Sequence, residues 1–196
     1  NKIGYFISFN ASFQRSELLY NAEANQRYDW MQRTGQPVGI QFGYVAEGLF
    51  QNQEEINSHA SIEGYRAQPG DIRYRDLNED GVINQYDQTA IGQKKPAVLL
   101  GTTLGFKIGS FDFSTLLQGR ANRKVYLSGN SYWEFQNSGS GQAFENQLNR
   151  WTPETAATAS YPRLSTGMGP RDGSVNNWVT SSYWLRNGNY LRVKTI

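Results

Sequence analysis

Residues 76–87 carry oxygen-bearing groups at the spacing of an EF-hand calcium loop. Such a loop binds its cation through positions 1, 3, 5, 7 and 12, and it needs glycine at position 6 for the turn. Gly81 occupies position 6. The expected ligands are, in order, Asp76, Asn78, Asp80, the backbone carbonyl of Val82, and Asp87. We therefore expect one structural calcium ion, because an all-oxygen site without an open position cannot activate water.

One position of this loop departs from the EF-hand pattern. Asp87 stands where a bidentate glutamate is usual, which resembles the dockerin-type variant and predicts a weaker or reshaped site. The alternative is an Asx-rich turn between two strands, in which side chains accept hydrogen bonds from the backbone. Three carboxylates this close repel one another unless a cation lies between them, so both interpretations stay open.

The remaining residues that could do chemistry predict no enzyme. The chain has no cysteine, which excludes disulfides, cysteine-ligated zinc and thiol catalysis. His59 is the single histidine, and we expect it to be a solvated surface residue rather than a metal ligand. Glu54 and Glu55 lie in residues 48–64, where we expect a short helix, and they fit a solvated helix face better than a glycosidase pair.

Composition favours a β-rich protein and disfavours a nucleic-acid binder. Aromatic residues make up 14% of the chain, and 20 glycines supply turns. The net charge is only +2, and Arg120, Arg123 and Lys124 form one local basic cluster rather than a stripe. No apolar run reaches the roughly 18 residues of a transmembrane helix, but transmembrane strands hide their apolar residues by alternation.

Hydrophobic alternation predicts strands in four parts of the chain. Residues 5–13 and 38–47 each alternate, and residues 182–194 resemble the start of a further strand. The clearest pair is residues 100–108 and 111–120, which we expect to form a hairpin around the turn Gly109-Ser110. Strands of about nine residues are long enough to cross a bilayer when tilted.

Several short phrases, taken in order, resemble the later barrel region of the SusC/RagA family of TonB-dependent outer-membrane transporters. The similarity extends over nearly the whole chain. The phrases are Gly35-Gln36-Pro37-Val38, Phe42-Gly43-Tyr44, Pro69-Gly70-Asp71, the loop 76–87, Ile91-Gly92, Phe111-Asp112-Phe113, Gln118-Gly119, Arg150-Trp151-Thr152-Pro153-Glu154, Tyr161-Pro162-Arg163, and residues 184–192.

This resemblance implies an all-β fold, with residues 1–196 forming a portion of a large antiparallel transmembrane β-barrel with long extracellular loops. It implies TonB-dependent import of large nutrients, oligosaccharides or peptides, across the Gram-negative outer membrane. The expected partners are membrane lipid, a SusD-like surface lipoprotein, a glycan or peptide substrate, and TonB through a plug. We expect the plug and the family's last strands to lie outside this chain, in a longer protein. Aromatic, Asn and Gln side chains on the loops suit a glycan and a peptide equally.

The same resemblance assigns a direction to each residue of the hairpin. Leu104, Phe106, Ile108, Phe111 and Phe113 are expected to face lipid, and Lys107, Asp112 and Gln118 to face the lumen. The long segments 48–68 and 122–182 are then extracellular, the loop 76–87 lies within an extracellular loop, and the short turn is periplasmic. Trp133, Trp151, Trp178 and Trp184 are expected in an interfacial girdle or a loop core more often than stacked on sugars. The alternative function is a soluble β-rich, calcium-stabilised binding module.

Overall fold

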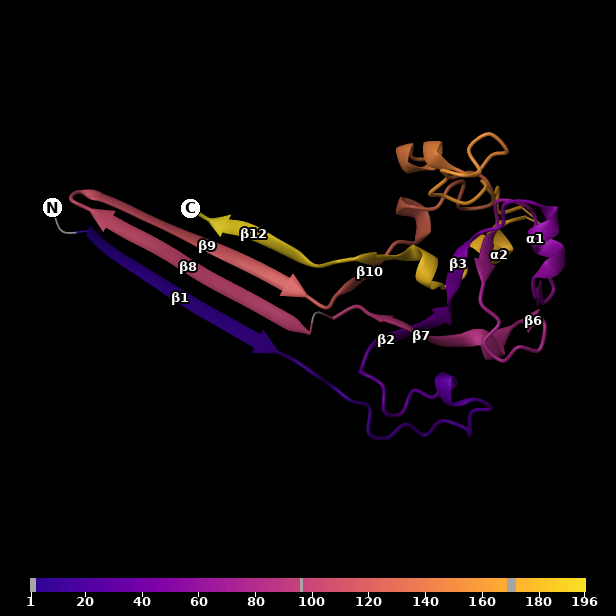
Figure 1. Cartoon of the computed structure of the whole chain (residues 1–196), viewed down its shortest axis with the longest axis horizontal. Helices are drawn as coiled ribbons and strands as arrows, with labels where there is room; N and C mark the ends of the chain where they lie inside the picture. The colour runs from indigo at the N-terminus through magenta and orange to yellow at the C-terminus, as the bar shows by residue number, and fades with distance from the viewer. Residues whose placement is uncertain (1–2, 96, 169–171) are drawn as a thin grey trace.

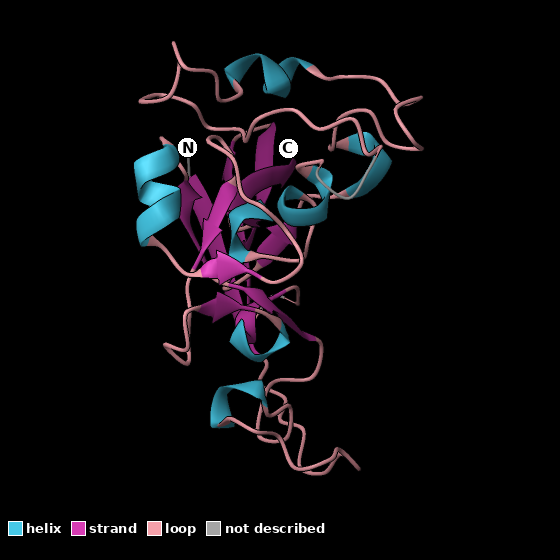
Figure 2. Ribbon diagram, turned by 90° about the vertical axis from the view of Figure 1, so that its right-hand side faces the viewer, coloured by secondary structure: helices cyan, strands magenta, loops and turns pink. Residues whose placement is uncertain are grey.

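The computed structural model describes residues 3–95, 97–168 and 172–196. Two regions make up the molecule (Figure 1). A sheet of long strands forms one end, and a body of loops, short strands and short helices forms the other, hereafter the loop body. Figure 2 views the molecule from the loop-body side, with the long strands lying behind the short helices. Strands dominate the secondary structure, in agreement with the β-rich composition and with the all-β class that the resemblance implied.

The large sheet has four antiparallel strands in the order β1-β8-β9-β12. Their bounds are β1 Ile3–Phe13, β8 Val98–Ile108, β9 Phe111–Ala121 and β12 Tyr190–Thr195. The predicted hairpin is confirmed, because β8 and β9 pair along their whole length with Phe106 opposite Phe113. Gly109 has φ +61°, a conformation that glycine adopts without strain in a two-residue turn.

Short and long connections alternate along this sheet. The two-residue turn joins β8 to β9 at one end, whereas residues 14–97 join β1 to β8 and residues 122–189 join β9 to β12 at the other end. Both long connections enter the loop body (Figure 1). Over the described residues the sheet does not close into a barrel, and β1 and β12 are its edge strands.

The loop body is built from two-stranded sheets and short helical turns. Its strands pair as β2-β7, β3-β5, β4-β6 and β10-β11. The elements of the first connection are η1 Asp29–Met31, β2 Ile40–Tyr44, β3 Ala46–Leu49, α1 Gln53–Ser58, β4 Ser61–Ile62, β5 Ile72–Tyr74, β6 Val82–Ile83, η2 Gln85–Asp87 and β7 Gln88–Gln93. Those of the second are β10 Lys124–Tyr126, η3 Gly129–Ser131, η4 Glu145–Asn149, α2 Ser174–Asn177, η5 Ser182–Trp184 and β11 Leu185–Asn187.

Two predicted strands differ from their predicted form. The run 38–47 is divided into β2 and β3, which pair within the loop body rather than in the large sheet. Gly43 packs closely against the second connection, since a Cβ atom on it would lie 2.4 Å from the backbone oxygen of Thr180. The run 182–194 begins as a 3-10 turn and continues as β11 and β12. The short helix expected in 48–64 is confirmed as α1, and Asn52 caps it by accepting a hydrogen bond from the Glu55 amide at 2.9 Å.

The hydrophobic core lies in the loop body and takes residues from both long connections. Trp184, with no exposed surface, lies at its centre, and Tyr161, Tyr132 and Tyr183 present their rings at steep angles to it with centroids 5.0 to 5.9 Å away. The buried core residues are Leu49, Ile72, Tyr74, Ile83, Tyr161 and Trp184. The core therefore joins the two connections, and Trp184 has the loop-core position expected of it.

Candidate functional site

The large sheet has one apolar face and one polar face. The register places the odd residues of β1, the even residues of β8 and the odd residues of β9 on one side. The apolar face contains Ile3, Tyr5, Ile7, Phe9, Phe13, Val98, Leu100, Leu104, Phe106, Ile108, Phe111, Phe113 and Leu117, and β12 adds Leu191 and Val193. The polar face contains Ser8, Asn10, Ser12, Thr103, Lys107, Asp112, Ser114, Gln118, Arg120 and Arg192, with Phe6, Leu99 and Leu116 as its large apolar side chains. Lys107, Asp112 and Gln118 thus lie opposite to the five apolar residues of the predicted hairpin.

The apolar face is exposed over a large area. Ile7 and Phe9 retain 69% and 65% of their surface, and Leu191 retains 72%. A contiguous apolar surface of this extent marks a contact with lipid or with another protein surface. Among the described residues, no helix is long and apolar enough to span a membrane.

Phe6 interrupts the alternation, and the structure gives the reason. Its ring lies over Gly105 of the neighbouring strand, where a Cβ atom would come within 2.2 Å of a ring carbon. Gly105 therefore leaves space on the polar face for an aromatic ring. The alternation predicted for residues 5–13 does not account for Phe6, and the glycine in the partner strand was the signal that could have explained it.

The loop 76–87 is shaped by hydrogen bonds from its own backbone. Asp76 accepts from the amides of Glu79 and Gly81, both at 2.8 Å. Asp80 accepts from the Val82 amide at 2.9 Å, and the Asn78 side-chain oxygen accepts from the Asp80 amide at 3.2 Å. Such bonds from the backbone to Asp and Asn side chains are typical of an Asx-rich turn, and the same side-chain oxygens are the expected ligands of the cation.

Asp87, the last expected ligand, is fully buried at the end of the loop. Its two carboxylate oxygens accept from the amides of Leu77 and Asn84, both at 2.8 Å, which ties the first and last turns of the loop together. Over the described residues, no three acidic or histidine side chains lie close enough to hold a metal ion. A cation would therefore require Asp76, Asp80 and Asp87 to turn toward one another. Calcium binding stays a prediction.

A buried ion pair joins the two long connections. Asp71, with no exposed surface, follows Pro69-Gly70 in the first connection and accepts from the Arg163 Nε at 2.6 Å. The Tyr65 hydroxyl donates to the other carboxylate oxygen of Asp71 at 2.7 Å, and the side-chain nitrogen of Asn177 donates to the same oxygen as Arg163 at 3.1 Å. Burial and the neighbouring Asp71 carboxylate raise the pKa of the Tyr65 hydroxyl, which therefore stays protonated as a donor. Two phrases that are far apart in the sequence, around Asp71 and Arg163, thus meet in one site.

A second buried carboxylate, Glu134, accepts hydrogen bonds from groups beside the core residue Tyr161. It accepts from the Tyr161 hydroxyl and from the Ser165 amide, the latter at 2.8 Å. Burial, followed by the hydrogen bond to Glu134, raises the pKa of Tyr161. The Gln147 side chain lies beside this pair, donating to the Tyr132 carbonyl at 3.0 Å. Sequence reasoning missed Glu134, because a lone glutamate in a loop carries no periodic signal.

His59 and the tryptophans of the loop body are half-buried or buried, although most of them lie in loops. His59 is half-buried, not solvated as predicted: its ring meets Phe50 edge-on at 5.4 Å, and its Nε2 lies 3.9 Å from Glu47. Trp133 stacks on Trp178 with ring centroids 6.0 Å apart, and Trp151 covers Gly70. These rings pack within the loop body.

Two curated proteins of Formosa agariphila resemble the chain. TonB-dependent receptor P26 is 30% identical over 166 residues, which is 83% of this chain. TonB-dependent receptor P3 is 24% identical over 172 residues, or 87% of the chain. The chain spans only 15% and 16% of the length of these relatives. No protein-family model matches it.

The names of these relatives bear on the predicted function. Both are named as receptors and not as enzymes. This agrees with the prediction that the chain has no catalytic function. The likeness includes the large sheet and the loop body, since more than four fifths of the chain is aligned in each case. Over most of its length, the chain is therefore homologous to one part of these two TonB-dependent receptors.

Proposed function

We propose that the chain is a segment of the wall and extracellular loops of a TonB-dependent outer-membrane transporter of the SusC/RagA kind, which imports oligosaccharides or peptides. The observation that carries this proposal is the large sheet, with one apolar face, one polar face, and long connections restricted to one end. In transmembrane barrels the apolar side chains face lipid, the polar ones face the lumen, and long loops alternate with short turns.

The dimensions of the strands support a membrane crossing. β1, β8 and β9 each contain 11 residues. At about 3.3 Å per residue they extend about 36 Å. With a tilt near 45° this corresponds to about 25 Å along the membrane normal, which is the height of the apolar band in outer-membrane barrels. The turn at Gly109 is then periplasmic, and the loop body is extracellular.

The partners follow from this placement. A SusD-like lipoprotein would contact the loop body from outside, and TonB would act through a plug in the whole protein. Calcium, bound by Asp76, Asn78, Asp80, the Val82 carbonyl and Asp87, would stiffen one extracellular loop. The loop spacing supports the ion, because Gly81 has φ +83° at the position where such loops need glycine.

Spin labels on one strand of the full-length protein test the membrane face. A nitroxide on Phe106→Cys should be relaxed by oxygen, which concentrates in lipid, whereas one on the adjacent Lys107→Cys should be relaxed by a water-soluble nickel chelate. The chain has no cysteine of its own, so each label reports one position in it. A water-exposed label at position 106 together with a lipid-exposed label at 107 would reject the assignment and favour the soluble binding module.

Labelling of intact cells tests the sidedness. Leu148 is 71% exposed in the second connection, and Ser110 lies in the tight turn. A membrane-impermeant maleimide should react with Leu148→Cys on intact cells and with Ser110→Cys only after the outer membrane is permeabilised. The opposite pattern would reverse the proposed topology.

A further inference from the structure

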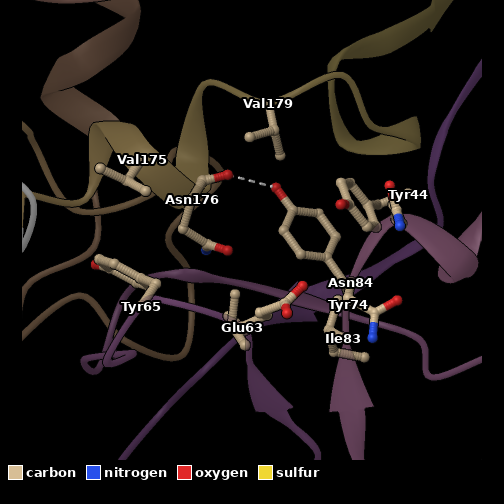
Figure 3. Close-up of a pocket in the computed structure, with 11 residues that line it drawn as sticks. Tyr44, Glu63, Tyr65, Tyr74, Ile83, Asn84, Val175, Asn176 and Val179 are labelled. Carbon is tan, nitrogen blue, oxygen red and sulfur yellow. Dashed lines mark hydrogen bonds between the residues drawn. The ribbon is translucent and has the colours of Figure 1, made fainter.

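We propose that a cavity between the two long connections binds one neutral sugar residue of a glycan substrate. This inference rests on the proposed function, since the glycan would be the imported nutrient. The cavity has a volume of about 380 Å³, within the range of small-ligand sites. Residues from β2, β4, β5 and β6 form one side of it, and α2 and the residue Val179 form the other (Figure 3).

One part of the cavity wall is apolar. Tyr44, Ile62 and Val179 form this surface, and the buried side chains of Tyr74 and Ile83 support it from behind, with the ring centroids of Tyr44 and Tyr74 5.2 Å apart. Tyr74 is held rigidly, because it is 1% exposed and its hydroxyl donates to the Asn176 carbonyl at 2.8 Å (Figure 3). Such a wall matches the C–H surface of a pyranose ring, which packs against aromatic and aliphatic side chains.

The polar groups of the cavity include both donors and acceptors. The Asn84 oxygen accepts from the Tyr86 amide at 2.9 Å, so its side-chain nitrogen is left to donate. The Asn176 nitrogen donates to the Ile72 carbonyl at 2.9 Å, so its side-chain oxygen is left to accept. The Glu63 carboxylate accepts only, and Figure 3 shows it directed toward the middle of the cavity.

This mixture of groups selects hydroxyls over the alternatives. A sugar hydroxyl both donates and accepts, so it can satisfy an amide nitrogen and a carboxylate together. An ammonium group only donates and would leave the Asn84 nitrogen without an acceptor. Among the residues that the structure describes, Glu63 is the one charged residue of the cavity lining, so a uronate or a sulfate ester would meet like charge from it and no cation from that lining. The cavity therefore fits a neutral, hydroxyl-rich ring.

The test is direct binding to the purified full-length protein in detergent. The probes are the methyl glycosides of glucose, galactose, mannose and xylose, with methyl galacturonate and lysine methyl ester as charged competitors. Saturation-transfer NMR should show millimolar binding of at least one neutral glycoside, because one ring makes few contacts. Val175→Trp should fill the mouth of the cavity and weaken this binding about tenfold, a change of about 1.4 kcal/mol.

Two matched controls accompany these variants. Val38→Trp adds the same ring at a valine that is also 44% exposed but does not line the cavity, and it should leave binding unchanged. Glu63→Gln keeps the shape of the cavity and should weaken binding about threefold or more through loss of a charged acceptor, whereas Glu54→Gln on α1 should not. Glu63→Gln keeps the test valid if Val175→Trp does not fold.

The inference is wrong if no neutral glycoside binds in a way that depends on both Glu63 and Val175. It is also wrong if methyl galacturonate or lysine methyl ester binds the cavity more tightly. Binding in detergent requires neither membrane insertion nor TonB. A negative result here would leave the spin-label result standing, and a failed spin-label test would leave the binding result standing.

Discussion

The large sheet and the loop body use the same amino acids in opposite ways. In the sheet, apolar side chains point outward from a single layer, and Ile7 and Phe13 remain 69% and 70% exposed. In the loop body, Ile72 and Trp184 have no exposed surface, and polar groups are buried beside them in pairs. The backbone of β8 is paired on both sides, and the apolar side chains of the sheet are left to the surroundings, whereas the loop body buries its own interior.

The difference matches the solvent that the proposed function gives to each region. Hydrocarbon cannot hydrogen-bond to a backbone, so a sheet in lipid must pair its strands and can expose apolar side chains freely. Water satisfies a loop backbone but penalises exposed apolar groups, so a region facing water needs a core. Buried polar groups such as Asp71 then need partners within the protein. A substitution that leaves a buried polar group unpaired should destabilise the loop body, and one that places a charge on the apolar face should destabilise the sheet.

The largest effect is expected at the buried ion pair of the loop body. Asp71→Ala leaves the Arg163 guanidinium, which is only 20% exposed, without its carboxylate. Breaking a buried pair from one side costs roughly 3 to 5 kcal/mol. Hydrogen exchange of the Ile72 and Tyr74 amides in the full-length protein should report this loss as easier local opening.

An exposed ion pair provides the control for that measurement. Glu47 and Arg75 lie 2.8 Å apart, but Arg75 is 57% exposed. Arg75→Ala should therefore change the same exchange by less than about 1 kcal/mol. Equal effects of Asp71→Ala and Arg75→Ala would mean that the loop body does not depend on its buried polar groups.

The second effect concerns the apolar face of the sheet. Leu104 lies on this face near the middle of β8, and Thr103 lies beside it on the polar face. Leu104→Arg should destabilise the membrane-embedded protein by roughly 2 to 4 kcal/mol, as a cation near the bilayer midplane does. Thr103→Arg should cost less than about 1 kcal/mol if that face borders a polar lumen.

Unfolding with urea in lipid vesicles would measure both variants. If Thr103→Arg were the more damaging of the two, the faces would be assigned the wrong way round. Similar, small effects of both variants would place the sheet in water and remove the basis of the comparison between the two regions.

The sequence predicted the sheet far better than it predicted the loop body. Alternation with period two predicts the side of the strand on which each residue lies. The two-residue turn separately predicts the register, which places Phe106 opposite Phe113. The run 38–47 also alternates, yet it pairs inside the loop body, because alternation does not specify the partner strand. Pairing is decided by contacts such as that of Gly43 with Thr180, which the local pattern does not contain.

The same limit applies to the candidate sites. The spacing of Asp76 and Asp87 could be recognised in the sequence as that of a metal-binding loop, because such a loop is a local motif. The pairing of Asp71 with Arg163 was not, since the two residues are brought together only by the packing of two long connections. The motif around each of the two residues could be recognised in the sequence. A short motif does not indicate which other motif it contacts in the folded chain.

A smaller effect is expected when calcium binds the loop 76–87. An ion bound only by the folded loop would stabilise it by about 2.7 kcal/mol at 100 times its dissociation constant. Terbium luminescence sensitised by Tyr86, which lies within the loop, should report binding and should disappear in Asp76→Asn. Exchange should slow within residues 76–87 and stay unchanged in β8. Binding that survives Asp76→Asn and Asp80→Asn together would place the ion elsewhere.

The smallest effect is expected at acid pH, where the loop body again differs from the sheet. Asp172 is partly buried, which raises its pKa, but hydrogen bonds from the Ser174 amide and from Thr166 outweigh this and lower the pKa from 3.8 to about 2. A carboxyl whose folded pKa lies below its unfolded value stabilises the fold at higher pH. That contribution is complete above about pH 4 and is lost as the pH falls toward 2.

Carboxyl carbon NMR would measure this titration, with Asp172→Asn assigning the resonance. Thr166→Val removes the hydroxyl, which donates to the carboxylate at 2.8 Å, while keeping the shape of the side chain. The pKa of Asp172 should then move part of the way back toward 3.8, because the backbone donors remain. Titration of Asp172 near 3.8 in the unmodified protein would show that these hydrogen bonds do not persist in solution. The loop body would then be less well packed on this side than around Trp184.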